Sequence, residues 1–178
     1  MATWAEVERE APELAQRVKA SFDAYKHKTM ATLRRDGSPR ISGTELDFAG
    51  GELMFGSMWG AMKARDLQRD PRIALHSATA DAELTLGDAK ISGRAVEIID
   101  DAEKEAYMAA HAAQAAAGAH DTAGEAPEEA DDGAEPEPYH LFRIEVTEVA
   151  HTRIGDPPDH LVVESWREGA GTNRVERR

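Results

Sequence analysis

Runs of alternating apolar and polar residues, separated by short turn signals, make up most of the chain after residue 27. Such alternation is typical of half-buried β-strands. Two turns have a clear cause, because Gly37 permits a positive φ beside Pro39, and Gly50-Gly51 suits a second hairpin. The pattern predicts strands over residues 28–35, 40–48, 52–57, 72–77, 84–99, 139–154 and 161–166, with a bulge or turn at Gly87-Asp88.

Helical periodicity marks three other segments. Residues 3–26 begin with a capping-box pattern, and Pro12 suits the first turn of a second piece, so we expect two helices or one kinked helix. Residues 60–69 predict a short helix, and residues 100–117 an Ala-rich one. Strands dominate and helices lie at ends and crossings. The sequence therefore predicts a mainly β (α+β) chain, an antiparallel barrel with peripheral helices, built as one domain over residues 1–178.

Charge is spread unevenly along the chain. The net charge is −13, but residues 119–138 hold eight acidic residues and no Lys or Arg. The rest has 26 acidic against 21 basic residues, a net charge of −5. We expect this acidic insert to be disordered and dispensable, because it has little apolar surface to bury. Nucleic-acid binding is not expected, since it needs a basic face.

Several classes of site are excluded by composition. The chain has no cysteine, which rules out disulfides and thiolate ligands and fits a cytoplasmic location. No apolar run is long enough to span a membrane, and the acidic N-terminus lacks the order of a signal peptide. The seven histidines form neither a His-x-His pair nor a His-Glu-x-x-His motif, so we expect no metal site.

Three motifs in fixed order carry a family resemblance: DGSPRISG at 36–43, ELMFGS at 52–57, and KARDLQRDP at 63–71 followed by RIAL. Together they resemble the pyridoxamine 5′-phosphate oxidase-like, FMN-binding split β-barrels, also called flavin/deazaflavin oxidoreductases. The resemblance implies an antiparallel split β-barrel and a homodimer. It also implies a flavin held in a cleft between the two subunits.

The resemblance assigns cofactor contacts to positions of this chain, with no catalytic residue identified. Strand, turn and helix residues grip the phosphate or line the ring, and the C-terminal segment closes the pocket. These expected contacts are Arg40, Ser42, Ser57, Met58, Trp59, Met62, Lys63, Trp166 and Arg178, with Arg177 an alternative to the last. The alternative interpretation makes Arg40 and Lys63 solvated surface charges, Trp166 a core residue and the terminal arginines a frayed tail.

The chain departs from the pattern of the true oxidases at four positions. Met62 replaces a basic residue, Ala61 a serine, Glu45 a lysine and Glu176 a histidine. We therefore expect hydride transfer between FMN and a small organic substrate other than a phosphorylated pyridoxamine. Two alternatives stay open: a reductase that uses the deazaflavin coenzyme F-420, and a non-catalytic flavin-binding carrier or sensor.

Overall fold

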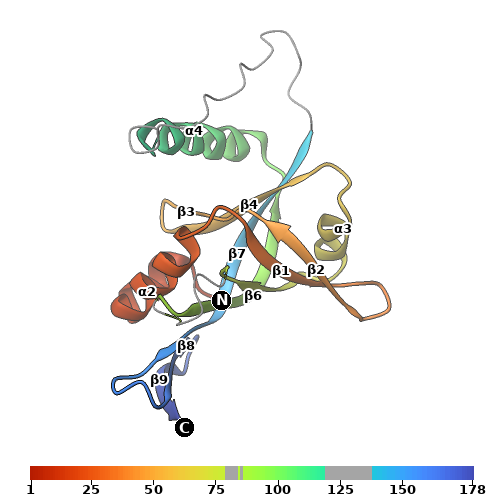
Figure 1. Cartoon of the computed structure of the whole chain (residues 1–178). Coiled ribbons are helices and arrows are strands. Elements are labelled where there is room, and N and C mark those ends of the chain that lie inside the picture. Colours follow the sequence, from red (N-terminus) through yellow and green to blue (C-terminus); the bar gives the residue numbers. More distant parts are fainter. Residues whose placement is uncertain (79–83, 85, 119–137) are drawn as a thin grey trace.

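A computed structural model of the chain describes residues 1–78, 84, 86–118 and 138–178. In the helix that ends at residue 118, side chains are described up to residue 111. The described part holds nine strands and four helices (Figure 1). In chain order the elements are α1 (Trp4–Glu10), α2 (Pro12–Asp23), β1 (Lys28–Leu33), β2 (Pro39–Thr44), β3 (Asp47–Ala49), β4 (Glu52–Met58), α3 (Met62–Arg69), β5 (Arg72–His76), β6 (Asp88–Ile98), α4 (Asp101–Gly118), β7 (Tyr139–Ile154), β8 (Leu161–Arg167) and β9 (Gly171–Arg177).

The strands form one antiparallel sheet that curls without closing. Its order is β2-β1-β5-β6-β7-β4-β3, and β8 continues from β7 and pairs with β9. Strand β2, at one end of the order, approaches β4, the last strand but one at the other end, but the two are not paired within the described part of the chain. We call this gap the seam. The predicted antiparallel split β-barrel with peripheral helices is confirmed.

Helices cover the ends of this barrel. Figure 1 shows α4 lying across one end, beyond β3 and β4, while the β8–β9 hairpin projects at the opposite end. Helix α3 follows β4 directly and packs against β1. Residues of both α3 and α4 lie beside the seam.

The N-terminal segment is two helices, the first of the two alternatives that the sequence left open. Thr3 and Glu6 make a complete capping box, and Pro12 is the first residue of α2. The apolar stripe of α2, including Val18 and Phe22, is buried against β6 and β7. Helix α2 thereby closes the core of the barrel.

Three details differ from the sequence expectation. The predicted strand at 40–48 is two strands, because β2 pairs with β1 and β3 pairs with β4, so the chain crosses the seam at residues 45–46. The strand expected from residue 84 starts at Asp88, after the expected turn, in which Gly87 has a φ of 71° and its N–H donates to the Leu84 carbonyl oxygen at 2.9 Å. A register irregularity lies further along the strand, between Ser92 and Gly93. A side chain at Gly93 would meet the carbonyl oxygen of Glu145 at 2.3 Å, which explains the glycine there.

Two further expectations concern the acidic insert and the membrane. The insert at 119–138 lies, apart from its last residue, outside the described residues, and its dispensability stays a prediction. None of the helices in the described part of the chain has the length and apolar character needed to cross a membrane.

Candidate functional site

A cavity of about 450 Å³ opens at the seam. We call it the seam cavity. Its walls come from β2, β4, α3 and α4, with Gly43, Thr44, Ser57, Met58, Lys63 and Tyr107 among the lining residues. Small-molecule sites commonly have volumes of roughly 300–1,000 Å³. The seam cavity is thus large enough for a cofactor-sized ligand.

Lys63 supplies the cation of the seam cavity. Its side chain crosses from α3 to the free edge of β2, where Nζ donates a hydrogen bond of 2.7 Å to the carbonyl oxygen of Gly43. Burial lowers the pKa of Lys63, and the nearby carboxylate of Glu45 acts in the opposite direction. An ammonium group has three N–H donors, and the two others have no partner among the described residues. Lys63 is therefore oriented and still able to bind an anion.

The start of α3 adds further donors at the same end. Ala61 precedes the helix as its N-cap and makes no side-chain cap hydrogen bond, so the first-turn N–H groups lack a side-chain partner. A helix N-terminus favours negative charge because of these groups and of the helix dipole. Lys63 lies in this first turn. The cation and the free N–H groups thus occupy the same end of the helix.

Ser57 is a buried residue of β4 with an unsatisfied hydroxyl. It lines the seam cavity, and its Oγ has no hydrogen-bond partner within the described part of the chain. Leaving a buried hydroxyl unpaired costs about 1–3 kcal/mol. A bound ligand that reached Oγ would relieve this cost, so Ser57 fits the binding role expected from the sequence. That role is not tested by the structure and stays a prediction.

Helix α4 forms the other end of the seam cavity, and the sequence did not indicate this. The Tyr107 hydroxyl donates a hydrogen bond to the Asp47 carboxylate, and His111 Nδ1 lies 3.3 Å from Asp47 Oδ2. Burial, and then this hydrogen bond, raises the pKa of Tyr107, which keeps its hydroxyl protonated. Tyr107 and His111 are four residues apart and share one helix face. That spacing was visible in the sequence, but the sheet edge they meet was not.

Arg40 is committed to a buried carboxylate rather than to the seam cavity. Its Nε donates to Asp66 Oδ2 at 2.6 Å, and Arg69 and Thr32 donate to the same carboxylate at 3.0 Å. Asp66 is only 2% exposed. A buried charge is tolerated only when it is paired and hydrogen-bonded. Arg40 therefore neutralises the buried carboxylate of Asp66.

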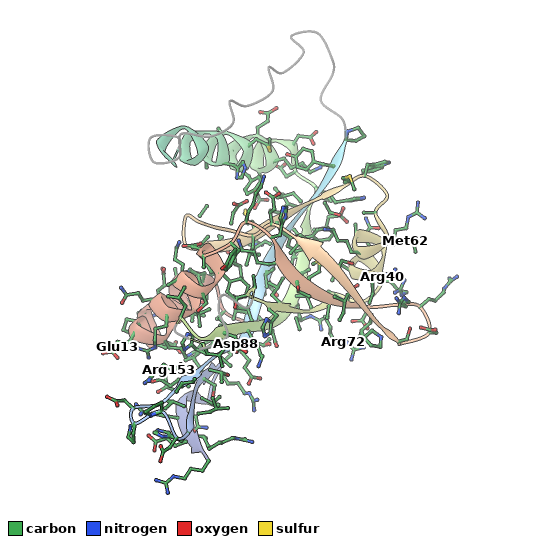
Figure 2. All side chains as sticks on the ribbon, in the orientation of Figure 1. Glu13, Arg40, Met62, Arg72, Asp88 and Arg153 are labelled. Atoms are coloured by element: carbon green, nitrogen blue, oxygen red, sulfur yellow. The ribbon has the colours of Figure 1, made fainter. Side chains whose placement is uncertain are left out.

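Arg40 and Met62 line a second cavity, of about 640 Å³, with Arg34, Arg35, Arg65 and Arg69. Figure 2 shows Arg40 and Met62 beside each other at α3 and the β1–β2 hairpin, far from Arg153 and Glu13. The structure therefore brings Ser57, Met58 and Lys63 together and places Arg40 and Met62 in the neighbouring cavity. Ser42 is half-buried on β2 and lines neither cavity.

Trp59 lies between β4 and α3 and points largely to solvent. Its side chain is 66% exposed and stacks on the ring of His140, with ring centroids 4.6 Å apart. Met58, 81% exposed, reaches the seam cavity from the same turn. Both residues are near the position that the resemblance implies for ring contacts.

The two C-terminal residues expected to contact the cofactor lie away from the seam cavity. Trp166 is 1% exposed, belongs to the core and donates through Nε1 to Glu10 Oε2 at 3.0 Å. Arg178 follows the exposed strand β9 and lines a different cavity near His160. Neither residue reaches the seam cavity of its own chain, because β8 continues the sheet away from the seam.

The residues of the seam cavity determine what it can bind. One end offers Lys63, a helix N-terminus and an unpaired hydroxyl, and the other offers Asp47, Tyr107 and His111. Met58 and Met108 add apolar contacts. This set fits a ligand with an anionic group and an apolar body. In the described part of the chain no three His, Asp or Glu side chains converge as they would around a metal ion.

The fold is shared with several solved proteins. PhzG from Burkholderia lata 383, solved with tetrahydrophenazine-1-carboxylic acid, is 16% identical, with a TM-score of 0.63 over 97% of this chain and 92% of that one. A pyridoxamine 5′-phosphate oxidase-related, FMN binding protein from Nostoc punctiforme PCC 73102 is 14% identical, with a TM-score of 0.57 over 97% of each chain. An F-420 reductase is 18% identical, with a TM-score of 0.50 over 74% of this chain and 94% of that one. At these identities the likeness establishes the fold.

No functionally curated protein matches the chain. The family model described as pyridoxamine 5′-phosphate oxidase matches residues 14–153, well over half of the chain. This stretch contains every strand from β1 to nearly the end of β7 and all the seam-cavity residues named above. The match confirms the resemblance read from the three motifs: the chain belongs to the pyridoxamine 5′-phosphate oxidase family, a flavin-binding family.

Proposed function

We propose that the chain is an oxidoreductase that binds FMN in the seam cavity and transfers hydride between this cofactor and a small organic substrate. The observation that carries the proposal is Lys63, oriented by Gly43 at the start of α3 with spare N–H donors. A phosphate group inside a cleft needs such paired donors. The bound cofactor supplies the hydride chemistry, and the protein supplies binding, orientation and electrostatics.

The other end of the seam cavity supports a substrate other than a phosphorylated pyridoxamine. Asp47 places a carboxylate there, held by Tyr107, and the carboxylate of Glu45 lies close to both Tyr107 and Lys63. Carboxylates repel a second phosphate group. We therefore propose a substrate without a phosphate, accepted at the α4 end.

The deazaflavin F-420 is the alternative cofactor. It presents a phosphate on a similar chain, so the Lys63 end serves it equally, and a solved F-420 reductase has the same fold. The lack of cysteine fits our further proposal that the protein works in the reducing cytoplasm.

We also propose that two copies of the chain form a homodimer. Large apolar side chains are exposed around the seam, and a second copy would cover them: Ile41, Met58, Trp59 and Met62. Trp166 and Arg178 do not reach the seam cavity of their own chain, so only a second copy could bring these C-terminal residues to it. Light scattering at micromolar concentration should give twice the chain mass of 19.4 kDa, and a stable monomer would contradict the proposal.

The decisive experiment identifies the cofactor and then asks for turnover. The absorption and mass spectra of the cofactor released from the purified protein distinguish FMN from the deazaflavin. Titration of the cofactor-free protein with FMN and with F-420 gives the two affinities. Oxidation of the reduced cofactor by small organic acceptors separates an oxidoreductase from a carrier or sensor. Protein that binds neither cofactor would overturn the proposal.

A further inference from the structure

The turn between β4 and α3, residues 58–61, connects the seam cavity to its cation. Met58 lines the cavity, and Lys63 follows the turn by two residues. Gly60 has φ of 70°, and the Ala61 N–H donates to the Met58 carbonyl oxygen at 3.1 Å. The conformation of this turn therefore decides where α3 begins and where Lys63 points.

His140 of β7 contacts this turn from inside the barrel. It is 5% exposed, and the Gly60 N–H donates to its Nε2 at 3.1 Å. A backbone N–H can only donate, so Nε2 must accept and the proton of the neutral ring lies on Nδ1. Nδ1 in turn donates to Glu97 Oε1 at 2.6 Å. The two ring nitrogens thus have fixed and opposite roles.

Glu97 extends the contact to the far end of α3. Its Oε2 accepts a hydrogen bond of 2.9 Å from Gln68 Nε2, in the last turn of the helix. Helix α3 has only eight residues. The His140–Glu97 pair therefore holds the helix just before its start, through Gly60, and near its end, through Gln68. Lys63 lies between these two attachments.

Trp59 adds a third contact to the same ring. Its indole stacks on His140 with an interplanar angle of 9°, although the side chain is mostly exposed. A solvent-facing tryptophan loses rotamer freedom when it is stacked in this way. His140 therefore holds both the backbone and the aromatic side chain of the turn.

We propose that His140 is a positioning residue for the anion-binding end of the seam cavity. Through its hydrogen bond with Gly60 it sets where α3 begins and where Lys63 presents its ammonium group, while Trp59 and Glu97, itself bonded to Gln68, hold the ring of His140 in place. His140 does not line the cavity. The inference rests on the proposed function, because it assigns the ligand of Lys63 to the cofactor phosphate.

Two substitutions separate the two halves of the network. The amide of Gln reaches about as far as Nε2, so His140→Gln keeps an acceptor for Gly60 and loses the Glu97 contact. The shorter amide of Asn reaches about as far as Nδ1, so His140→Asn keeps the donor to Glu97 and loses Gly60. Both variants lose the stacked ring.

The expected order of FMN affinity follows from which contact survives. We expect His140→Gln to bind FMN within about twofold of the parent, and His140→Asn to bind it about three- to tenfold more weakly, the loss of one hydrogen bond. Melting temperatures should fall by similar amounts in the two variants. Equal FMN affinities for Asn, Gln and parent would overturn the inference, as would affinities that simply follow the melting temperatures.

A second readout needs no cofactor. Nitrogen NMR of the parent should show the His140 ring protonated on Nδ1 and accepting at Nε2, and Trp59 emission, obtained by difference from Trp59→Phe, should change in both variants. A ring protonated on Nε2 would overturn the network. A parent that binds neither FMN nor F-420 would overturn the proposed function and the ligand role of His140 with it, whereas a parent that binds while Asn and Gln are equal would overturn only the inference.

Discussion

The sequence predicts cofactor contacts both at the α3 end of the seam and in the C-terminal hairpin, but in the structure only the first set of residues lines a common cavity. At the α3 end, Ser57, Met58 and Lys63 line one cavity, although they come from a strand and a helix. In the hairpin, Trp166 is a core residue and Arg178 lies at the opposite end of the barrel from α4 (Figure 1). Residues that share a family pattern meet within one chain only when the sheet order makes their elements neighbours.

The two regions also owe their stability to different interactions. The α3 region is built around Asp66, a buried carboxylate with three hydrogen-bonding partners. The hairpin is joined to the barrel by Trp166, whose indole is packed in the core and reaches Glu10. Charge pairing responds to pH and apolar packing responds to side-chain volume, which makes the comparison open to experiment.

The largest effect should come from the hairpin. We expect Trp166→Ala to lower the free energy of unfolding by about 3–5 kcal/mol, because it removes the core packing of a large aromatic side chain. Urea denaturation measures this change. The milder Trp166→Phe tests the alternative: if Trp166 contacts flavin, FMN affinity falls in this variant, whereas a core role leaves affinity unchanged in the folded protein.

The α3 region should instead be sensitive to charge. Burial alone would raise the pKa of Asp66, but hydrogen bonds from Arg40, Arg69 and Thr32 outweigh it and leave the pKa below its ordinary value. A lowered pKa contributes stability above the unfolded-state pKa of about 4, and this stability is lost as the pH falls through the folded-state pKa.

Asp66→Asn should therefore lower the free energy of unfolding by about 2–3 kcal/mol at neutral pH, and the loss should shrink in acid. Urea denaturation of both proteins from neutral pH to about pH 3 measures the difference. Glu105→Gln is the control, because Glu105 is an exposed residue of α4 with no hydrogen bond or ion pair among the described residues. A difference that is independent of pH would show that the charge of Asp66 does not stabilise this region.

Lys63→Ala should weaken cofactor binding without unfolding the protein. Losing a charge-assisted contact costs about 1.5–3 kcal/mol, roughly a ten- to hundredfold loss of affinity for FMN or the deazaflavin. Lys90→Ala is the matched control, since Lys90 is an exposed lysine of β6 that lines neither cavity described here. Equal affinities for Lys63→Ala and the parent would remove the phosphate site from the seam cavity.

The smallest effect belongs to Arg178. If a second copy brings its C-terminus to the seam cavity, Arg178→Ala should weaken FMN binding by about two- to tenfold, the loss of one hydrogen bond. Titration of the dimeric protein measures this. Arg167→Ala, which removes an exposed arginine of this hairpin that pairs with Glu148 of β7, is the control. An unchanged affinity would leave the terminal arginine outside the site and would sharpen the contrast between the two regions.

The sequence by itself determined the elements whose signals are local. Alternation indicated most strands, although not β9; Gly37 with Pro39 indicated the first turn; and the capping box and Pro12 indicated two helices or one kinked helix at the N-terminus. Three motifs in order were enough to identify the family. These features depend on residues close together in the chain, so no knowledge of distant pairings was needed.

Only the tertiary structure decided which side chains meet. The strand expected at 40–48 divides because each half finds a different partner strand, and this crossing forms one wall of the seam cavity. Arg40 is hydrogen-bonded to Asp66, twenty-six residues away, and does not line the cavity that holds Lys63. The contact between Tyr107 and Asp47 could not be predicted from the sequence either. Such contacts depend on strand order and on the need to neutralise a buried charge, and neither is written in the spacing of residues along the chain.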